Sequence, residues 1–128
     1  MTKVTPFLMF QGPGAEAAAF YAELFDDGRF RVEQNDADGE PMLMTLTIGG
    51  QDVRLLNSPT QHDFDFSPTF SFYVIVDDED EVDRLHAALS DGGRELMPLN
   101  SYPFSPRYCW VTDRFGVSWQ VGVAADAD

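Results

Sequence analysis

An internal duplication is the feature that most limits how this chain can fold. Residues 5–25 and 70–93 each read as a short apolar strand that leads through a turn into an amphipathic helix. Three further strand-like runs follow each helix, so the same order of elements occurs twice, with a period of roughly 64 residues. The sequence therefore predicts an α+β fold built from two tandem βαβββ modules.

The first module is expected to occupy about residues 1–58. Gly12-Pro13-Gly14 interrupts the first apolar run, and a helix is expected to begin there, because proline is tolerated in the first turn of a helix. The expected elements are a strand within 4–10, a helix over 15–25, and strands over 29–34, 42–48 and 52–57. Glycine-containing separators between these strands predict hairpin turns.

The second module is expected at about residues 69–125, after a linker loop over 59–68. Acidic residues at 77–79 favour a helix N-terminus, and an apolar stripe at Val82, Leu85 and Leu89 predicts the helix itself. The expected elements are a strand over 69–76, this helix, and short strands at about 94–97, 108–113 and 117–123. Residues 98–107 are expected to form a loop, and residues 113–116 a turn.

Charge and length exclude several classes of protein. The chain has 128 residues, enough for one domain with a core, and 22 acidic against 8 basic residues give a net charge of −14. A field of this sign repels phosphate backbones and anionic lipids, so we expect no nucleic-acid and no membrane partner. The sequence contains one cysteine, no signal-peptide pattern and no apolar stretch near the ~20 residues of a membrane span. We expect a cytoplasmic protein.

Three segments carry a resemblance to a known family. They are TPFLMFQGPGAEAAAFYAELF (5–25), FSFYVIVDDEDEVDRLHAALSDGG (70–93) and WVTDRFGVSWQV (110–121). With its paired βαβββ modules, the chain resembles the vicinal-oxygen-chelate superfamily of glyoxalase I, bleomycin-resistance proteins and extradiol dioxygenases. More narrowly it resembles the PhnB-like branch, often labelled 3-demethylubiquinone-9 3-methyltransferase. The resemblance implies a glyoxalase-like fold, in which a curled mixed sheet forms a cleft that holds a metal or ligand.

The resemblance also indicates where a metal would be bound. The ligand positions of metal-using relatives fall at Thr5, Ser71 and Gln120, and, where the alignment is loose, at Leu56 or Asn57. A divalent ion requires imidazole or carboxylate ligands, whereas these side chains are neutral. The glycine pattern of an adenosyl-cofactor turn is also incomplete at Gly12-Pro13-Gly14. We therefore expect no metal and no other cofactor.

The histidines and the cysteine do not change this expectation. His86 is expected on the surface of the second helix. His62 is expected at the surface of the linker loop, with the rim of a cavity and a metal ligand as the alternatives. Cys109 alternates with Trp110 along its strand and is expected to be a small buried apolar residue.

Strand alternation extends the cleft positions to a candidate pocket. The predicted lining is apolar and aromatic with a few hydroxyls and amides, a composition common at small-molecule sites: Thr5, Phe7, Met9, Asn57, Ser71, Tyr73, Trp110, Ser118 and Gln120. A packed core or a dimer seam is the alternative, above all for Phe7 and Met9. If Gln120 lines a cleft, its replacement by leucine is expected to change stability by no more than about 1 kcal/mol, or to raise it.

Three functions follow from this interpretation. The first is a small-molecule-binding protein of the bleomycin-resistance type that binds its ligand without a metal. The negative net charge of the chain favours cationic ligands at long range. The second is a metal-independent enzyme that uses Tyr73 or a carboxylate as its acid–base group. The third is a dimeric interaction module without chemistry. In each case a homodimer is expected, because the resemblance and the unpaired strand edges of half-open modules favour pairing.

Overall fold

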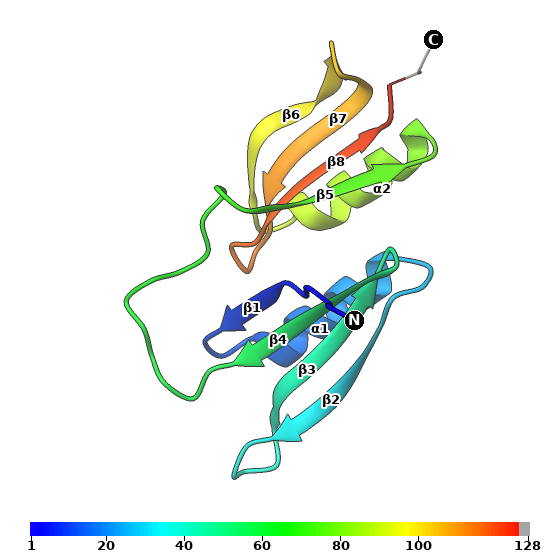
Figure 1. The fold of residues 1–128 in the computed structure, drawn as a ribbon. Helices are drawn as coiled ribbons and strands as arrows, with labels where there is room; N and C mark the ends of the chain where they lie inside the picture. Colours follow the sequence, from blue (N-terminus) through cyan, green and yellow to red (C-terminus); the bar gives the residue numbers. More distant parts are fainter. Residues whose placement is uncertain (126–128) are drawn as a thin grey trace. The chain divides into compact units, whose positions relative to one another are not determined.

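The fold consists of two compact units, one of residues 1–63 and one that begins at Phe64. The computed structural model describes residues 1–125 (Figure 1). In chain order the elements are β1 (Phe7–Phe10), α1 (Gly14–Leu24), β2 (Arg29–Asn35), β3 (Pro41–Ile48), β4 (Gln51–Asn57), β5 (Ser71–Val76), α2 (Glu79–Ser90), β6 (Arg94–Tyr102), β7 (Ser105–Thr112) and β8 (Ser118–Val123). In the described part of the chain, neither helix is long and apolar enough to cross a membrane.

The first unit is a four-stranded sheet in the order β1-β4-β3-β2, with α1 packed against one face (Figure 1). β1 runs parallel to β4, and the other neighbouring strands are antiparallel. Alternation along the strands directs one set of apolar side chains towards α1. The core between sheet and helix contains Leu8, Phe10, Ala17, Ala18, Tyr21, Leu24, Met44, Leu46, Val53 and Leu55, all buried.

The second unit repeats this topology in the order β5-β8-β7-β6, and β5 runs parallel to β8. α2 begins at an N-cap in which the Asp78 carboxylate accepts a hydrogen bond from the backbone N–H of Glu81. The predicted stripe of Val82, Leu85 and Leu89 is buried, and α2 packs against β7 and β8. On the sheet this core is formed by Cys109, Val111, Trp119 and Val121, also buried.

The observed elements confirm the predicted α+β class and the duplication of the βαβββ unit. The strands form two four-stranded mixed sheets, one in each unit. One detail differs. Residues 98–107 are not a loop, because β6 and β7 continue through them as a hairpin with register shifts. The three prolines of this segment suggested a break, but register shifts allow a strand to accommodate residues that cannot donate to the ladder.

Candidate functional site

The second sheet presents an aromatic and polar face on the side opposite α2. The register places Ser71 beside Ser118, Tyr73 beside Gln120, and Gln120 beside Trp110. All five predicted pocket residues of this unit therefore lie on one face of the sheet. Together with their neighbours on the same strands they form what we call the aromatic face: Ser71, Tyr73, Ile75, Tyr108, Trp110, Thr112, Ser118, Gln120 and Gly122.

Hydrogen bonds across the strands hold the polar groups of the aromatic face in place. The hydroxyl oxygens of Ser71 and Ser118 are 2.6 Å apart, and the indole Nε1 of Trp110 donates to the Ser118 hydroxyl at 2.8 Å. The hydroxyl of Tyr108 donates to Oε1 of Gln120 at 2.6 Å. The side chains are thus oriented by each other.

Tyr108 is the member of this network that the sequence analysis missed. Its side chain is 2% exposed, and burial, followed by the nearby Tyr73, raises its pKa to about 12. The phenol therefore stays protonated and acts as a hydrogen-bond donor to Gln120. Residues two apart on a strand share a face, so the position of Trp110 could have placed Tyr108 on this face. Its hydrogen-bond partner Gln120, however, is set by the pairing of β7 with β8.

The β6–β7 hairpin adds two further aromatic side chains beside Tyr108. The rings of Tyr102 and Phe104 are stacked with centroids 5.6 Å apart, and each meets the Tyr108 ring edge-on, at 5.5 and 4.8 Å. The hydroxyl of Tyr102 donates to the carbonyl of Pro98 at 2.6 Å. Sequence reasoning assigned these residues to a loop and gave them no role.

The Tyr108–Gln120 hydrogen bond reverses the expected effect of a Gln120 substitution. Gln120→Leu is now expected to lower the free energy of unfolding by about 1–3 kcal/mol, because it leaves the buried Tyr108 hydroxyl without its acceptor. Urea unfolding of the two proteins measures the change. Tyr108→Phe/Gln120→Leu, which removes both partners, is expected to recover much of the loss. A stability of Gln120→Leu equal to that of the parent would contradict the structural role of this bond.

The predicted pocket residues of the first unit are not gathered in the same way. Phe7 and Met9 lie on the face opposite α1, where Phe7 is 54% exposed and Met9 is half-buried. Thr5 precedes β1 and lies outside the sheet. Asn57 also has a structural role, because its Oδ1 accepts hydrogen bonds from the backbone N–H groups of Gly12 and Gly14, at 2.8 and 3.2 Å. Its side chain holds the turn before α1.

The side chains at the superfamily's metal positions do not fit a metal ion. Ser71 and Gln120 are neutral and are hydrogen-bonded to Ser118 and Tyr108, and Thr5 is neutral as well. Such donors cannot balance the charge of a divalent cation. Within residues 1–125, no group of three or more His, Cys, Asp or Glu side chains is arranged to hold a metal.

The two histidines are engaged by neighbouring polar groups, and the cysteine is buried. His86 Nε2 lies 2.9 Å from the Glu95 carboxylate at the surface of α2, as predicted for a partly exposed helix residue. The backbone N–H of His62 donates to Gln11 Oε1 at 2.6 Å, and its ring lies 3.4 Å from the Ser58 hydroxyl. Cys109 is buried, and burial, followed by the charge of Glu95, raises its pKa to about 11. A thiol in that state is not a nucleophile.

Comparison with solved structures identifies the fold. A glyoxalase-related enzyme from Fulvimarina pelagi matches with a TM-score of 0.60 at 20% identity, over 96% of this chain and 88% of that chain. A fosfomycin resistance protein from Listeria monocytogenes matches with a TM-score of 0.64 at 10% identity, over 98% and 95%. At these identities the likeness is one of fold alone. The shared architecture is a glyoxalase-like fold.

Two closer matches identify the family. The family of 3-demethylubiquinone-9 3-methyltransferases matches residues 2–122. A PhnB protein from Bacillus cereus, provisionally described as a 3-demethylubiquinone-9 3-methyltransferase, is 38% identical over 96% of this chain and 100% of that chain, with a TM-score of 0.89. The chain therefore belongs to the 3-demethylubiquinone-9 3-methyltransferase family. A search of curated proteins finds no match.

The architecture differs from that of the commonest methyltransferases. Those enzymes bind their adenosyl cofactor at a glycine-rich turn in a parallel α/β sheet. Here each described sheet has one parallel pair, β1 with β4 or β5 with β8, and the remaining pairs are antiparallel. The family's name therefore does not by itself assign a cofactor site to these sheets.

Proposed function

We propose that this protein binds a small aromatic or cationic molecule on the aromatic face of its second unit. The observation that carries the proposal is Tyr73, a residue that is 57% exposed beside a network of part-buried, mutually oriented polar groups. An exposed phenol ring offers a flat apolar surface and a π-face for a cation. The resemblance to bleomycin-resistance proteins and the negative net charge support a ligand of this class.

The chemistry of the face supports binding without a metal or a catalytic group. The nine residues of the aromatic face are uncharged, and the phenol of Tyr108, whose pKa is raised, is held as a donor to Gln120. General acid–base catalysis at neutral pH needs a group that titrates near that pH. A binding protein needs only oriented polar groups and apolar surface, both of which this face provides.

Tyr73→Ala tests the proposed function. With benzyltrimethylammonium, which is both aromatic and cationic, as the probe, we expect the dissociation constant to rise about 2- to 30-fold, because a cation–π contact contributes about 0.5–2 kcal/mol. Isothermal titration calorimetry measures the change. Phe64→Ala is the matched control, because Phe64 is 59% exposed, similar to Tyr73, and lies outside the aromatic face. Equal effects of the two substitutions, or no saturable binding by the parent, would reject the proposal.

We further propose that the protein is a homodimer. Each four-stranded sheet ends in two edge strands, and β5, one of these, exposes the large side chains of Tyr73 and Ile75. Exposed edges and apolar side chains favour association with a second copy. Sedimentation at micromolar concentration is expected to give twice the chain mass of 14.3 kDa. A single species of chain mass would contradict the dimer, and dissociation caused by Tyr73→Ala would identify the aromatic face as an interface.

A further inference from the structure

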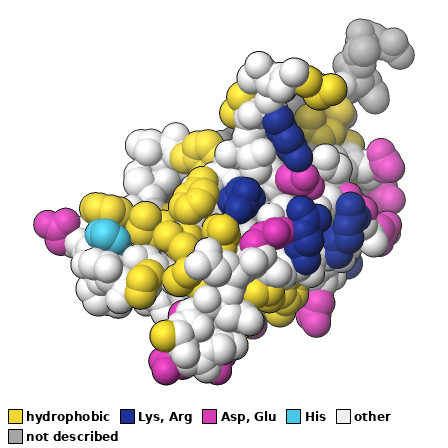
Figure 2. Space-filling view, turned by 60° about the horizontal axis from the view of Figure 1, so that its bottom comes forward, with side chains coloured by type: hydrophobic (Ala, Val, Ile, Leu, Met, Phe, Trp, Pro, Cys, Tyr) yellow, Lys and Arg dark blue, Asp and Glu magenta, His cyan; other side chains and the backbone are white. Residues whose placement is uncertain are grey.

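The first unit carries half of the positive charge of this strongly acidic chain. Only eight residues are Lys or Arg, and four of them, Lys3, Arg29, Arg31 and Arg54, belong to β2, β4 or the segment before β1. Figure 2 shows Lys and Arg side chains interleaved with acidic ones beside a hydrophobic area. The net charge of the whole chain therefore does not describe this surface, because interactions weaken beyond a Debye length of about 10 Å.

The strand register gathers three of these arginines. Arg31 and Arg54 lie on either side of Thr45, and Arg29 lies beside Thr47. These positions share the face of the sheet opposite α1, since the alternate residues Met44, Leu46 and Val53 are buried in the core. We call this surface the arginine face: Arg29, Arg31, Thr45, Thr47 and Arg54. A small cavity of about 80 Å³ is lined by four of these residues and by Phe30.

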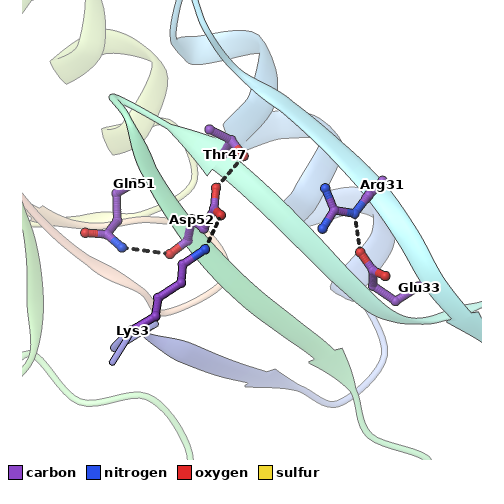
Figure 3. Close-up of polar contacts among 6 residues, drawn as sticks. All are labelled: Lys3, Arg31, Glu33, Thr47, Gln51 and Asp52. Carbon is purple, nitrogen blue, oxygen red and sulfur yellow. Dashed lines mark hydrogen bonds and ion pairs between the residues drawn. The ribbon is translucent and has the colours of Figure 1, made fainter. Parts of the chain in front are cut away.

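Two carboxylates engage part of the positive charge. Lys3 Nζ lies 2.8 Å from Asp52, whose other oxygen accepts a hydrogen bond from Thr47 at 2.8 Å, and Arg31 pairs with Glu33 (Figure 3). The hydrogen bond from Lys3, followed by that from Thr47, lowers the pKa of Asp52. The hydrogen bond from Arg31 in the same way lowers the pKa of Glu33. Both acids are thus carboxylates at neutral pH, and they compensate Lys3 and Arg31.

Arg54 forms no such ion pair in the described part of the chain. Within the described residues its Nε atom is buried and has no hydrogen-bond partner, and no carboxylate lies within ion-pair distance of Arg54 or Arg29. A buried donor on a charged group is costly to leave unpaired. A guanidinium group is also the side chain best suited to bind a carboxylate or phosphate through two parallel hydrogen bonds.

Apolar side chains border Arg54 on two sides. Phe7 is its neighbour on β1, and the next row of the register contains Met9, Leu56 and Leu43. Phe7 is exposed, and the other three side chains are half-buried. A ligand whose oxyanion reaches Arg54 can therefore lay an apolar body against this row.

We propose that the arginine face binds the oxyanion of a small organic molecule, a carboxylate or phosphate monoester, with Arg54 as the principal donor and Phe7 and Met9 against its apolar part. Glu33, which lies beside Arg31 and interacts with Arg54, competes with such a ligand for the same positive charge. A long polyanion does not suit the site, since the net charge of −14 repels it.

Titration with phenyl phosphate, benzoate and inorganic phosphate tests the proposal. Calorimetry at low ionic strength is expected to show saturable binding of an aromatic oxyanion, with inorganic phosphate weaker because it lacks the apolar body. Arg54→Gln should weaken this binding at least tenfold, and Glu33→Gln should strengthen it severalfold. Arg84→Gln is the matched control, because it makes the same charge change on α2, where Arg84 pairs with Glu81, and should alter binding less than twofold.

The relative affinities of phenyl phosphate and benzoate identify the oxyanion, and either order supports the site. Equal weakening by Arg54→Gln and Arg84→Gln would show a general charge effect and overturn the proposal, as would the absence of saturable binding. A second measurement uses the parent protein alone, so it does not depend on whether the Arg54→Gln variant folds. NMR follows the resonances of the arginine Nε–Hε groups during the titration. The Arg54 resonance should shift on titration, and an unchanged resonance would overturn the site. Neither result bears on the aromatic face, which lies in the other unit and is tested with a cationic probe.

Discussion

Asp113→Ala is expected to lower the free energy of unfolding by about 4 kcal/mol. The Asp113 side chain is 4% exposed, and its Oδ1 accepts hydrogen bonds from the backbone N–H groups of Phe115 and Val117 at 2.9 and 3.0 Å. Its Oδ2 accepts a hydrogen bond from the indole Nε1 of Trp119 at 2.9 Å. Alanine would leave the buried N–H groups of Val117 and Trp119 unpaired, and each such group costs about 1–3 kcal/mol. Urea unfolding followed by circular dichroism measures the change.

Two further variants separate this effect from a loss of charge. The amide oxygen of Asp113→Asn can still accept from the backbone N–H groups, but its NH2 group then faces the indole N–H of Trp119, and two donors cannot pair. We therefore expect about half of the loss in unfolding free energy that Asp113→Ala causes. Asp63→Ala removes an exposed carboxylate and is expected to change stability by less than about 0.5 kcal/mol. An Asp113→Ala protein as stable as Asp63→Ala would show that the turn does not hold β8. Because β8 carries Ser118 and Gln120, a disrupted turn should also weaken binding on the aromatic face.

Gly28→Ala is expected to lower the free energy of unfolding by about 3 kcal/mol, a large value for overpacking. A Cβ atom added at Gly28 would lie 1.8 Å from the carbonyl oxygen of Ala22 in α1, so the backbone would have to move. The second unit repeats this turn. Gly28 and Gly93 each donate a backbone hydrogen bond three residues back, at 2.9 Å, and a Cβ atom at Gly93 would lie 2.1 Å from the Thr112 oxygen.

Gly39→Ala provides the control for this prediction. Gly39 has a φ of 84°, but a Cβ atom there would meet nothing within 4 Å. Its replacement therefore involves backbone strain alone, for which we expect a loss of about 1 kcal/mol. Thermal and urea unfolding of the three alanine variants give the order of stabilities. If Gly28→Ala and Gly93→Ala were as stable as Gly39→Ala, the helix-to-strand turns would not be closely packed.

The sequence by itself determined the duplicated order of elements and five of the nine residues of the aromatic face. The spacing of apolar residues along a helix or a strand is a local property of the sequence. The apolar stripe of α2 and the alternation of side chains around Trp119 could therefore be predicted without knowledge of the tertiary contacts. The same alternation placed Tyr73 and Gln120 on faces that the β5–β8 register brings together. The turn at residues 113–116 was also predicted from its residue types, and the structure confirms it with a hydrogen bond from Gly116 N–H to the Asp113 carbonyl.

The tertiary structure decided which side chains meet, because contacts across strands depend on a register that joins residues far apart in the chain. Gln120 was predicted to face a cavity, but pairing of β7 with β8 gives it Tyr108 as a partner. Asn57 was predicted in the pocket, and its oxygen also holds the turn before α1. The arginine face could not be foreseen, since the pairing of β2, β3 and β4 alone brings Arg31 and Arg54 to opposite sides of Thr45.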